Sequence, residues 1–185
     1  MYSGKNQVVL RRLASTLDHL SEVLQTGMIK FTCTIGFAGR EFVMRIGLFS
    51  VVDHYPAELE RSLAQFYEEL LAQGVLADSL GFDSFWLAEH HFHEYGVIPR
   101  PAVFLAALAA KSKQIRLGSA VAILPFDNPL RVAEDFAMLD IISAGRLEFG
   151  AGSGYLAHEF AGFAVDAESR RERFDEALAI IMQAW

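Results

Sequence analysis

Apolar runs and amphipathic segments alternate along the chain from Met44 onward. The short apolar runs at 45–52, 84–88, 114–121 and 146–151 have the length and composition of buried strands. After each run, apolar residues recur at three- and four-residue steps, and glycine or proline separates the segments. The pattern predicts four strands alternating with four helices, as in parallel α/β sheets.

The four predicted helices each have one apolar face. We expect these faces to pack on the sheet, because an amphipathic helix buries its apolar stripe. The predicted faces comprise Leu59, Leu63, Phe66, Leu70, Gly74, Ala77 and Leu80 in the first helix, Val103, Leu105 and Leu108 in the second, Val132, Phe136 and Leu139 in the third, and Phe174, Leu178 and Ile181 in the last.

Residues 1–43 differ in charge from the rest of the chain. They contain five Lys/Arg and three Asp/Glu, whereas residues 44–185 contain eleven and twenty. We therefore expect 1–43 to be an N-terminal extension, with one helix across residues 8–24 and a less regular segment after it, and 44–185 to be one domain. Met1, Met28 and Met44 can each serve as the start.

Composition limits the classes of molecule that the chain is expected to bind. The chain is 52% hydrophobic, its net charge is −7 and its pI is about 5.3. Nucleic acids and anionic membranes favour basic proteins, and no apolar run reaches about 18 residues, so we expect neither partner. The lone Cys33 fits a reducing cytoplasm. A small-molecule substrate is the better expectation.

Two architectures fit the alternation, a doubly wound sheet and a (β/α)8 barrel. A barrel takes about 250 residues. The 142 residues from Met44 are enough for four of its eight βα units. A barrel interpretation therefore predicts an α/β half barrel, and a truncated chain.

Polar residues follow the apolar run 84–88 directly: Glu89, His90, His91 and His93. Histidine and glutamate can ligate metals, but neighbouring residues leaving a strand point to opposite faces, which disfavours a metal site. General acid/base chemistry needs only one imidazole facing a pocket. Glu89 is then a candidate to orient that imidazole.

A glycine-rich stretch, 150–155, follows the last apolar run. Its backbone N–H groups and Ser153 can hold an anion, although a tight turn after a strand explains the glycines equally well. The spacing Gly-x-Gly-x-Gly differs from the dinucleotide-binding Gly-x-Gly-x-x-Gly, which disfavours a nicotinamide-binding fold.

Three blocks of the chain together resemble the bacterial-luciferase-like flavin-dependent monooxygenases, in the order and spacing of that family. The blocks are Gly81–Phe92, Leu117–Pro125 with Asn128–Arg131, and Ser143–Gly150 with Gly152–Tyr155. The resemblance covers the N-terminal half of the family's (β/α)8 TIM barrel. It implies an oxidoreductase in which reduced FMN, supplied by a flavin reductase, reacts with O2 and oxidises a small organic substrate through a flavin peroxide, aldehydes being one class.

The resemblance also assigns roles to residues. His90 matches the catalytic base, and Glu89 belongs to the same wall of the flavin pocket. Ala120 and Val121 match a pair joined by a non-prolyl cis peptide bond beneath the flavin ring. Gly152, Ser153, Gly154 and Tyr155 match the flavin-contacting loop. No metal is expected.

Other interpretations stay open at this point. The deazaflavin F420 replaces FMN in some members of the family, which would make the chain an F420-dependent dehydrogenase.

A half barrel leaves open sheet edges and a bare inner face. We therefore expect the chain to bind flavin poorly or not at all by itself, and to pair with itself as a homo-oligomer or with a related chain. A non-catalytic flavin-binding or interaction fragment is the alternative to an enzyme.

Overall fold

The structure is a computed structural model. It describes residues 29–38, 41–55, 57–58, 60–94 and 96–185, with side chains from Arg45 onward. The helix predicted across residues 8–24 lies outside the described residues, as does Leu59.

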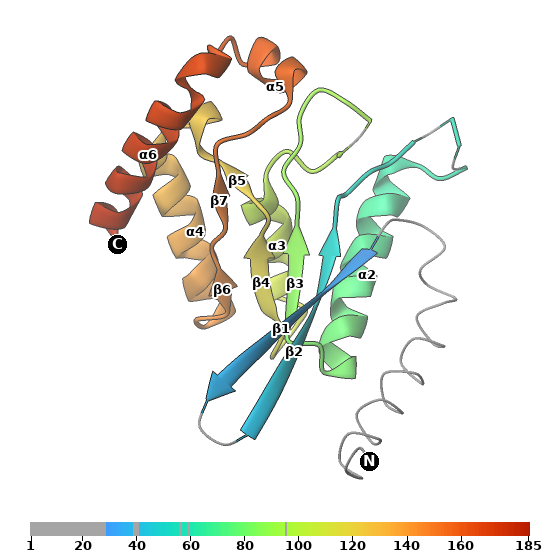
Figure 1. The fold of residues 1–185 in the computed structure, drawn as a ribbon. Helices are drawn as coiled ribbons and strands as arrows, with labels where there is room; N and C mark the ends of the chain where they lie inside the picture. The colour runs from blue at the N-terminus through green and yellow to red at the C-terminus, as the bar shows by residue number, and fades with distance from the viewer. Residues whose placement is uncertain (1–28, 39–40, 56, 59, 95) are drawn as a thin grey trace.

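One five-stranded sheet organises the fold (Figure 1). Its strands, in spatial order, are β1 (Ile29–Ala38), β2 (Glu41–Ser50), β3 (Ser84–Leu87), β4 (Arg116–Ser119) and β6 (Leu147–Glu148). β1 pairs with β2 in antiparallel fashion, and all other pairs are parallel. Beyond β4 and β6 the chain forms a second parallel pair, β5 (Ala122–Ile123) and β7 (Ala151–Gly152).

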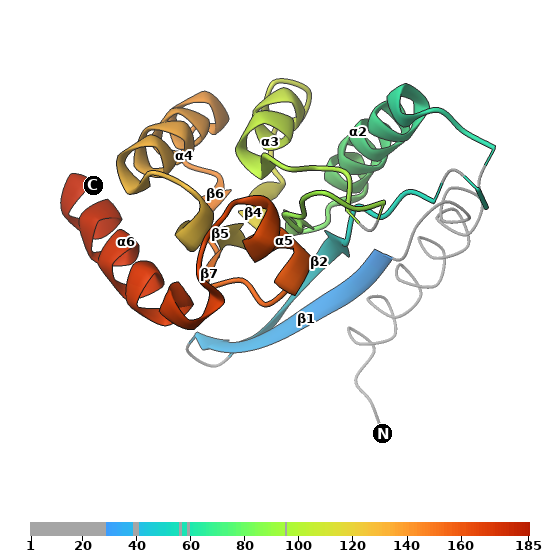
Figure 2. The same cartoon turned by 90° about the horizontal axis from the view of Figure 1, so that it is seen from above.

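The larger helices form a layer on one side of this sheet (Figure 2). The helices are α2 (Leu63–Leu80), α3 (Pro101–Ala109), α4 (Pro129–Ser143), α5 (Ala157–Gly162) and α6 (Arg170–Ala184), with 3₁₀ turns η2 (Leu124–Phe126) and η3 (Ala167–Ser169). Each parallel strand is followed by a helix, so the chain is α/β and builds successive units of a partial barrel, as predicted. Among the described residues, no helix is long and apolar enough to cross a bilayer.

Local chemistry sets where the helices begin and end. Ser62 and Gln65 form a capping box at the start of α2, and Gly81 ends that helix in the left-handed conformation. Asn128 caps α4 by accepting a hydrogen bond from the backbone N–H of Leu130. These caps satisfy backbone donors that a helix end leaves unpaired.

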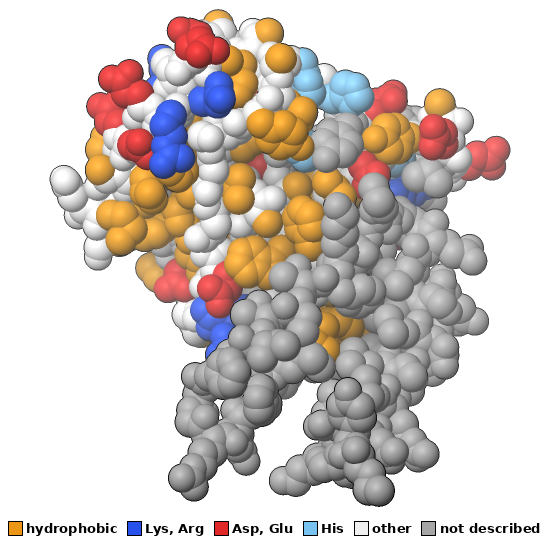
Figure 3. All heavy atoms as spheres, viewed as in Figure 1, with side chains coloured by type: hydrophobic (Ala, Val, Ile, Leu, Met, Phe, Trp, Pro, Cys, Tyr) orange, Lys and Arg blue, Asp and Glu red, His pale blue; other side chains and the backbone are white. Residues whose placement is uncertain are grey.

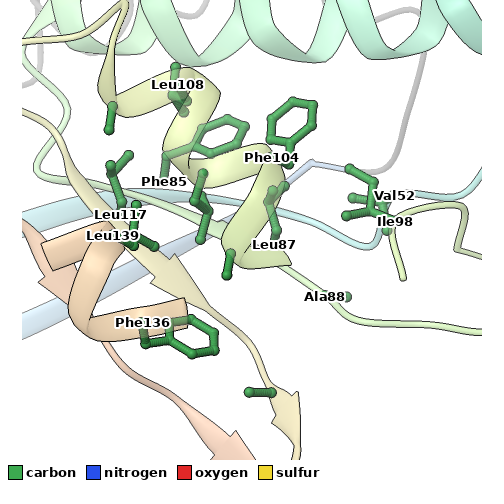
Figure 4. Close-up of a cluster of buried hydrophobic side chains, with 14 of the residues drawn as sticks. Val52, Phe85, Leu87, Ala88, Ile98, Phe104, Leu108, Leu117, Phe136 and Leu139 are labelled. Carbon is green, nitrogen blue, oxygen red and sulfur yellow. The ribbon is translucent and has the colours of Figure 1, made fainter. Parts of the chain in front are cut away.

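The hydrophobic core lies between the sheet and the helix layer (Figure 4). On β3, Phe85 and Leu87 are buried toward the helices, whereas Ser84 and Trp86 face the other side. A Cβ atom at Gly118 would lie 2.1 Å from Cε3 of the Trp86 ring, so only glycine fits there. The second face of this strand lines a cavity, to which Ser84 and Trp86 both contribute.

The predicted helix faces are correct in their centres and wrong at some edges. Phe66, Leu70, Leu105, Leu108, Val132, Phe136, Leu139 and Ile181 are buried, but Leu63, Leu80 and Val103 are 47%, 38% and 68% exposed. Leu63 and Leu80 are the terminal residues of α2, where the helix extends past the sheet. The first parallel strand also begins earlier than predicted, at Glu41, because it pairs with β1 along its whole length.

Arg146 ties the loop before β6 to the neighbouring unit. Its Nε donates to the Ser143 carbonyl (2.7 Å), and its terminal nitrogens donate to the Ser112 hydroxyl (2.8 Å) and to the carbonyls of Ile115 and Ala109 (3.0 Å each). A planar guanidinium can serve all of these acceptors at once, which a lysine cannot. This residue therefore locks β6 in place, and with it the glycine-rich segment that follows.

Asp78 holds the turn before β4, and its carboxylate should make stability depend on pH. It accepts hydrogen bonds from the backbone N–H groups of Lys113, Gln114 and Ile115, at 2.7–2.8 Å. Burial raises the pKa of Asp78, but these donors and Arg146 outweigh it and hold the pKa below its ordinary value. A lowered pKa adds stability above the unfolded-state pKa of about 3.9, and that stability is lost as the pH falls through the folded-state value.

We therefore expect Asp78→Asn to lower the free energy of unfolding at pH 7, and the difference from wild type to shrink below about pH 4. Urea unfolding at pH 7 and pH 3 measures this. Asp175→Asn, on the exposed face of α6, is the matched control. An Asp78→Asn deficit of equal size at both pH values would contradict the assignment.

Candidate active site

A cavity of about 460 Å³ lies at the carboxyl ends of the parallel strands. Its volume is within the range of small-molecule sites. Its lining residues are Phe49, Val51, Ala88, Glu89, His90, Ala120, Val121, Ile123, Gly152, Ser153, Gly154 and Tyr155. All eight site residues predicted from the sequence are among them. The structure therefore brings together three segments that are far apart in the chain.

Hydrogen bonds past the strand ends set these segments side by side. The Ala88 N–H donates to the Ser50 carbonyl (3.0 Å), and the Ala120 N–H donates to the Leu87 carbonyl (2.6 Å). Further along, the Ala122 N–H donates to the Gly150 carbonyl (2.8 Å). The carboxyl ends of parallel strands meet at one edge of a barrel, where such folds place their active sites.

His90 is buried in the wall of this cavity, with only 6% of its surface exposed. Its Nδ1 lies 3.2 Å from Oε1 of Glu159. A carboxylate accepts hydrogen bonds and does not donate them, so the pair favours the tautomer with the proton on Nδ1. Gly96 closes the other side of the ring, since a Cβ there would lie 2.2 Å from Cβ of His90. The imidazole is thus held in one orientation, with Nε2 as the nitrogen that can accept a proton.

Glu159 is the site residue that sequence reasoning missed. It lies in α5, is 1% exposed, and its Oε1 also accepts a hydrogen bond from the backbone N–H of His91 (2.9 Å). A helix of six residues is too short to show periodicity, and nothing in the sequence distinguishes Glu159 from the other acidic residues. A carboxylate this deeply buried needs donors around it, and two consecutive histidines supply them.

Glu89 and His91 form a second carboxylate–imidazole pair, with Oε1 and Nε2 3.1 Å apart. The His91 ring packs edge-on against Phe163, at 4.7 Å between centroids, and does not line the cavity. His90 therefore lines the cavity, whereas the His91 ring packs against an aromatic side chain outside it. Within the part of the chain that the structure describes, no three His, Cys, Asp or Glu side chains are placed to hold a metal ion.

Another part of the cavity wall, around the Ala120–Val121 peptide, is apolar. The peptide bond between Ala120 and Val121 is cis. Gly152 lies against Val121, and a Cβ added at Gly152 would be 2.4 Å from Cγ2 of that valine. Tyr155, 73% exposed, stands at the mouth. This wall offers backbone and methyl surface without bulky side chains, which suits a planar ring.

A second cavity, of about 440 Å³, lies on the same concave face nearer the amino ends of the strands. It shares Phe49 and Ala120 with the first. Three of its charged groups bind one another or the backbone: Arg116 pairs with Glu148, and Asp83 accepts from the Ile46 N–H. Figure 3 shows apolar side chains spread over this side of the molecule. The amino ends of barrel strands serve stability, so the first cavity is the candidate active site.

Comparisons with known proteins agree with this geometry. The family model described as luciferase-like monooxygenase matches residues 44–185. The chain is 33% identical, over 77% of its length, to the oxygenase component of the flavin-dependent trigonelline monooxygenase of Acinetobacter baylyi, and covers 39% of that protein.

Two solved structures share the fold. Monooxygenase RslO1 from Streptomyces bottropensis is 43% identical with a TM-score of 0.66, over 69% of this chain and 38% of that one. The oxygenating constituent of 3,6-diketocamphane monooxygenase from Pseudomonas putida, in complex with FMN, is 28% identical with a TM-score of 0.65, over 68% and 35%. The chain spans well under half the length of these relatives. Its family match covers most of its own residues, and the chain therefore belongs to the luciferase-like monooxygenase family.

Proposed function

We propose that this chain forms the flavin- and O2-handling part of a flavin-dependent monooxygenase, in which reduced FMN and O2 oxidise a small organic substrate. The observation that supports the proposal most is the cavity at the strand ends, which a buried imidazole oriented by a buried carboxylate lines together with apolar residues. The family match and a relative described as flavin-dependent support the same chemistry.

The cavity fits a flavin ring on its own geometry. The isoalloxazine is planar and mostly apolar, with polar atoms along its edges. Val121, Ile123 and Phe49 supply apolar contact, and the missing side chain at Gly152 leaves room along the wall. Residues 152–155 line the same cavity, and their backbone groups can form hydrogen bonds with polar edge atoms. A mostly apolar pocket with a few polar groups is the usual form of a cofactor site.

Within this site, His90 is assigned the proton transfer. When bound, reduced FMN would supply two electrons, so that one atom of O2 enters the substrate and the other leaves as water. Glu159 holds Nδ1–H of His90, which leaves Nε2 to accept a proton from a reacting group, and its negative charge stabilises the imidazolium that results.

The proposed reaction also requires partner proteins. A relative described as an oxygenase component points to a separate reductase that supplies reduced flavin. Pairing with a second copy or a related chain would complete the open sheet. We place the reaction in the cytoplasm, where such reductases find reduced nicotinamide and where the lone Cys33 stays reduced.

Oxygen incorporation tests the reaction type. The protein, a flavin reductase, NADH and FMN are incubated under 18O2 with trigonelline, a bicyclic diketone or an alkanal. We expect substrate-dependent O2 uptake and one 18O atom in the product. Oxidation of a substrate that needs F420 and no O2 would instead identify an F420-dependent dehydrogenase.

Adding one methyl group at Gly152 should weaken flavin binding. The Cβ of Gly152→Ala would lie 2.4 Å from Cγ2 of Val121, so that valine must move into the cavity. We expect the Kd for FMN to rise about tenfold, as overpacking commonly costs 1–3 kcal/mol. Fluorescence titration measures it. Ser153→Ala, the neighbouring control that adds no bulk, should change the Kd less than about threefold; equal effects of both variants would contradict this placement.

A further inference from the structure

The cavity assigned to the flavin has almost no positive charge. Of its twelve lining residues, only Glu89, His90 and Tyr155 can ionise. None of the lining residues that the structure describes is lysine or arginine.

Two of the three arginines that line the adjoining cavities are held by carboxylates, and the third, Arg45, lines the lower cavity and not the upper one. Arg100 adjoins a small neighbouring cavity that also includes Glu89 and Ile123, and it pairs with Asp127 and with Asp135 at 2.8 Å. Arg116 lines the lower cavity and pairs with Glu148. Each of these guanidinium groups is neutralised by a carboxylate and forms part of a link between elements of the fold.

A phosphate group would therefore find poor surroundings in this cavity. A phosphate monoester carries about −1.5 to −2 charge at pH 7. Proteins bind such groups with arginine, lysine or the N-terminus of a long helix, and the backbone N–H groups of a glycine-rich loop add to these charges. The loop 152–155 offers such N–H groups without a lysine or arginine among the described lining residues. Here the ionisable groups beside it would include the Glu89 carboxylate, and α5 has only six residues. Burying an anion without a partner is costly. The uncharged oxidised flavin ring has no such penalty.

We infer that this chain recognises the isoalloxazine ring and does not recognise the ribityl phosphate, so that riboflavin and FMN bind to it equally well. The inference rests on the proposed flavin site and adds which part of the cofactor this chain selects. The flavin phosphate then extends out of the cavity into solvent, or toward other protein surface, without adding affinity from the described residues.

Titration of the protein with riboflavin, FMN and lumiflavin, followed by flavin fluorescence anisotropy, tests this inference. We expect Kd values for riboflavin and FMN within about threefold of each other. We also expect the FMN value to change little between 50 and 500 mM NaCl, since no ion pair would be screened. A larger preference for FMN would overturn the inference and leave the flavin site intact. If none of the three ligands binds up to millimolar concentration, the flavin site itself is refuted, and the inference with it.

Glu89→Gln gives a second, independent test. If the phosphate lies outside the cavity, removing this negative charge changes the Kd of FMN and of riboflavin by the same factor. A selective gain for FMN of more than about threefold would place the phosphate beside residue 89 and overturn the inference. Circular dichroism and the unfolding midpoint of the variant show that it folds.

Discussion

Replacing His90 with alanine is expected to lower the turnover number by about 10²- to 10⁴-fold, the usual size of a general acid/base contribution. Flavin affinity should change by less than about threefold, because the substitution leaves the part of the cavity wall formed by Val121 and Gly152 unchanged. Stopped-flow turnover and fluorescence titration of the same preparation measure the two quantities separately.

His93→Ala is the matched control, since it removes an exposed imidazole three residues away. We expect it to keep turnover within about twofold of wild type. His90→Gln, which keeps some of the side-chain volume, should be as impaired as His90→Ala. Unchanged turnover in either His90 variant would rule out its role as the base.

Replacing Glu159 with glutamine should lower turnover about 10- to 100-fold, by removing a buried negative charge while keeping an acceptor for the His91 N–H. Without the carboxylate, the protonated His90 imidazole loses its counter-charge. Turnover should therefore fall while the Kd for flavin stays within about threefold of wild type. A purely structural role for Glu159 would lower the unfolding midpoint and leave the turnover of the folded protein unchanged.

Glu168→Gln makes the same charge change at an exposed position in η3 and should leave turnover unchanged. Glu159→Ala should in addition lower the free energy of unfolding by about 1–3 kcal/mol, because the buried His91 N–H then lacks a partner. A Glu159→Gln variant with wild-type turnover would show that the contact does not serve catalysis.

Much of the fold follows from the sequence pattern, since strand and helix periods differ and the helix caps are explicit. The meeting of Glu89 and His90 with residues 152–155 follows too, because parallel strands end at one edge. The Ala120–Val121 wall has no signal in polarity or spacing; only the resemblance to a known family singled it out.

Other features depend on contacts that no local pattern encodes. Glu159 lies in a helix of six residues, and its burial depends on two histidines almost 70 residues away. The exposure of Val103 depends on where α3 sits relative to the sheet. The pairing of β1 with β2 requires knowledge of a partner strand.

Flavin should bind in the cavity at the carboxyl ends of the strands and not in the lower cavity. Titration of 15N-labelled protein with riboflavin, followed by amide chemical shifts, tests this directly. We predict the largest changes at Val121, Gly152 and Gly154, which line the upper cavity. Changes centred on Gly47 and Ser84, which line the lower cavity, or no changes at saturating ligand, would contradict the account.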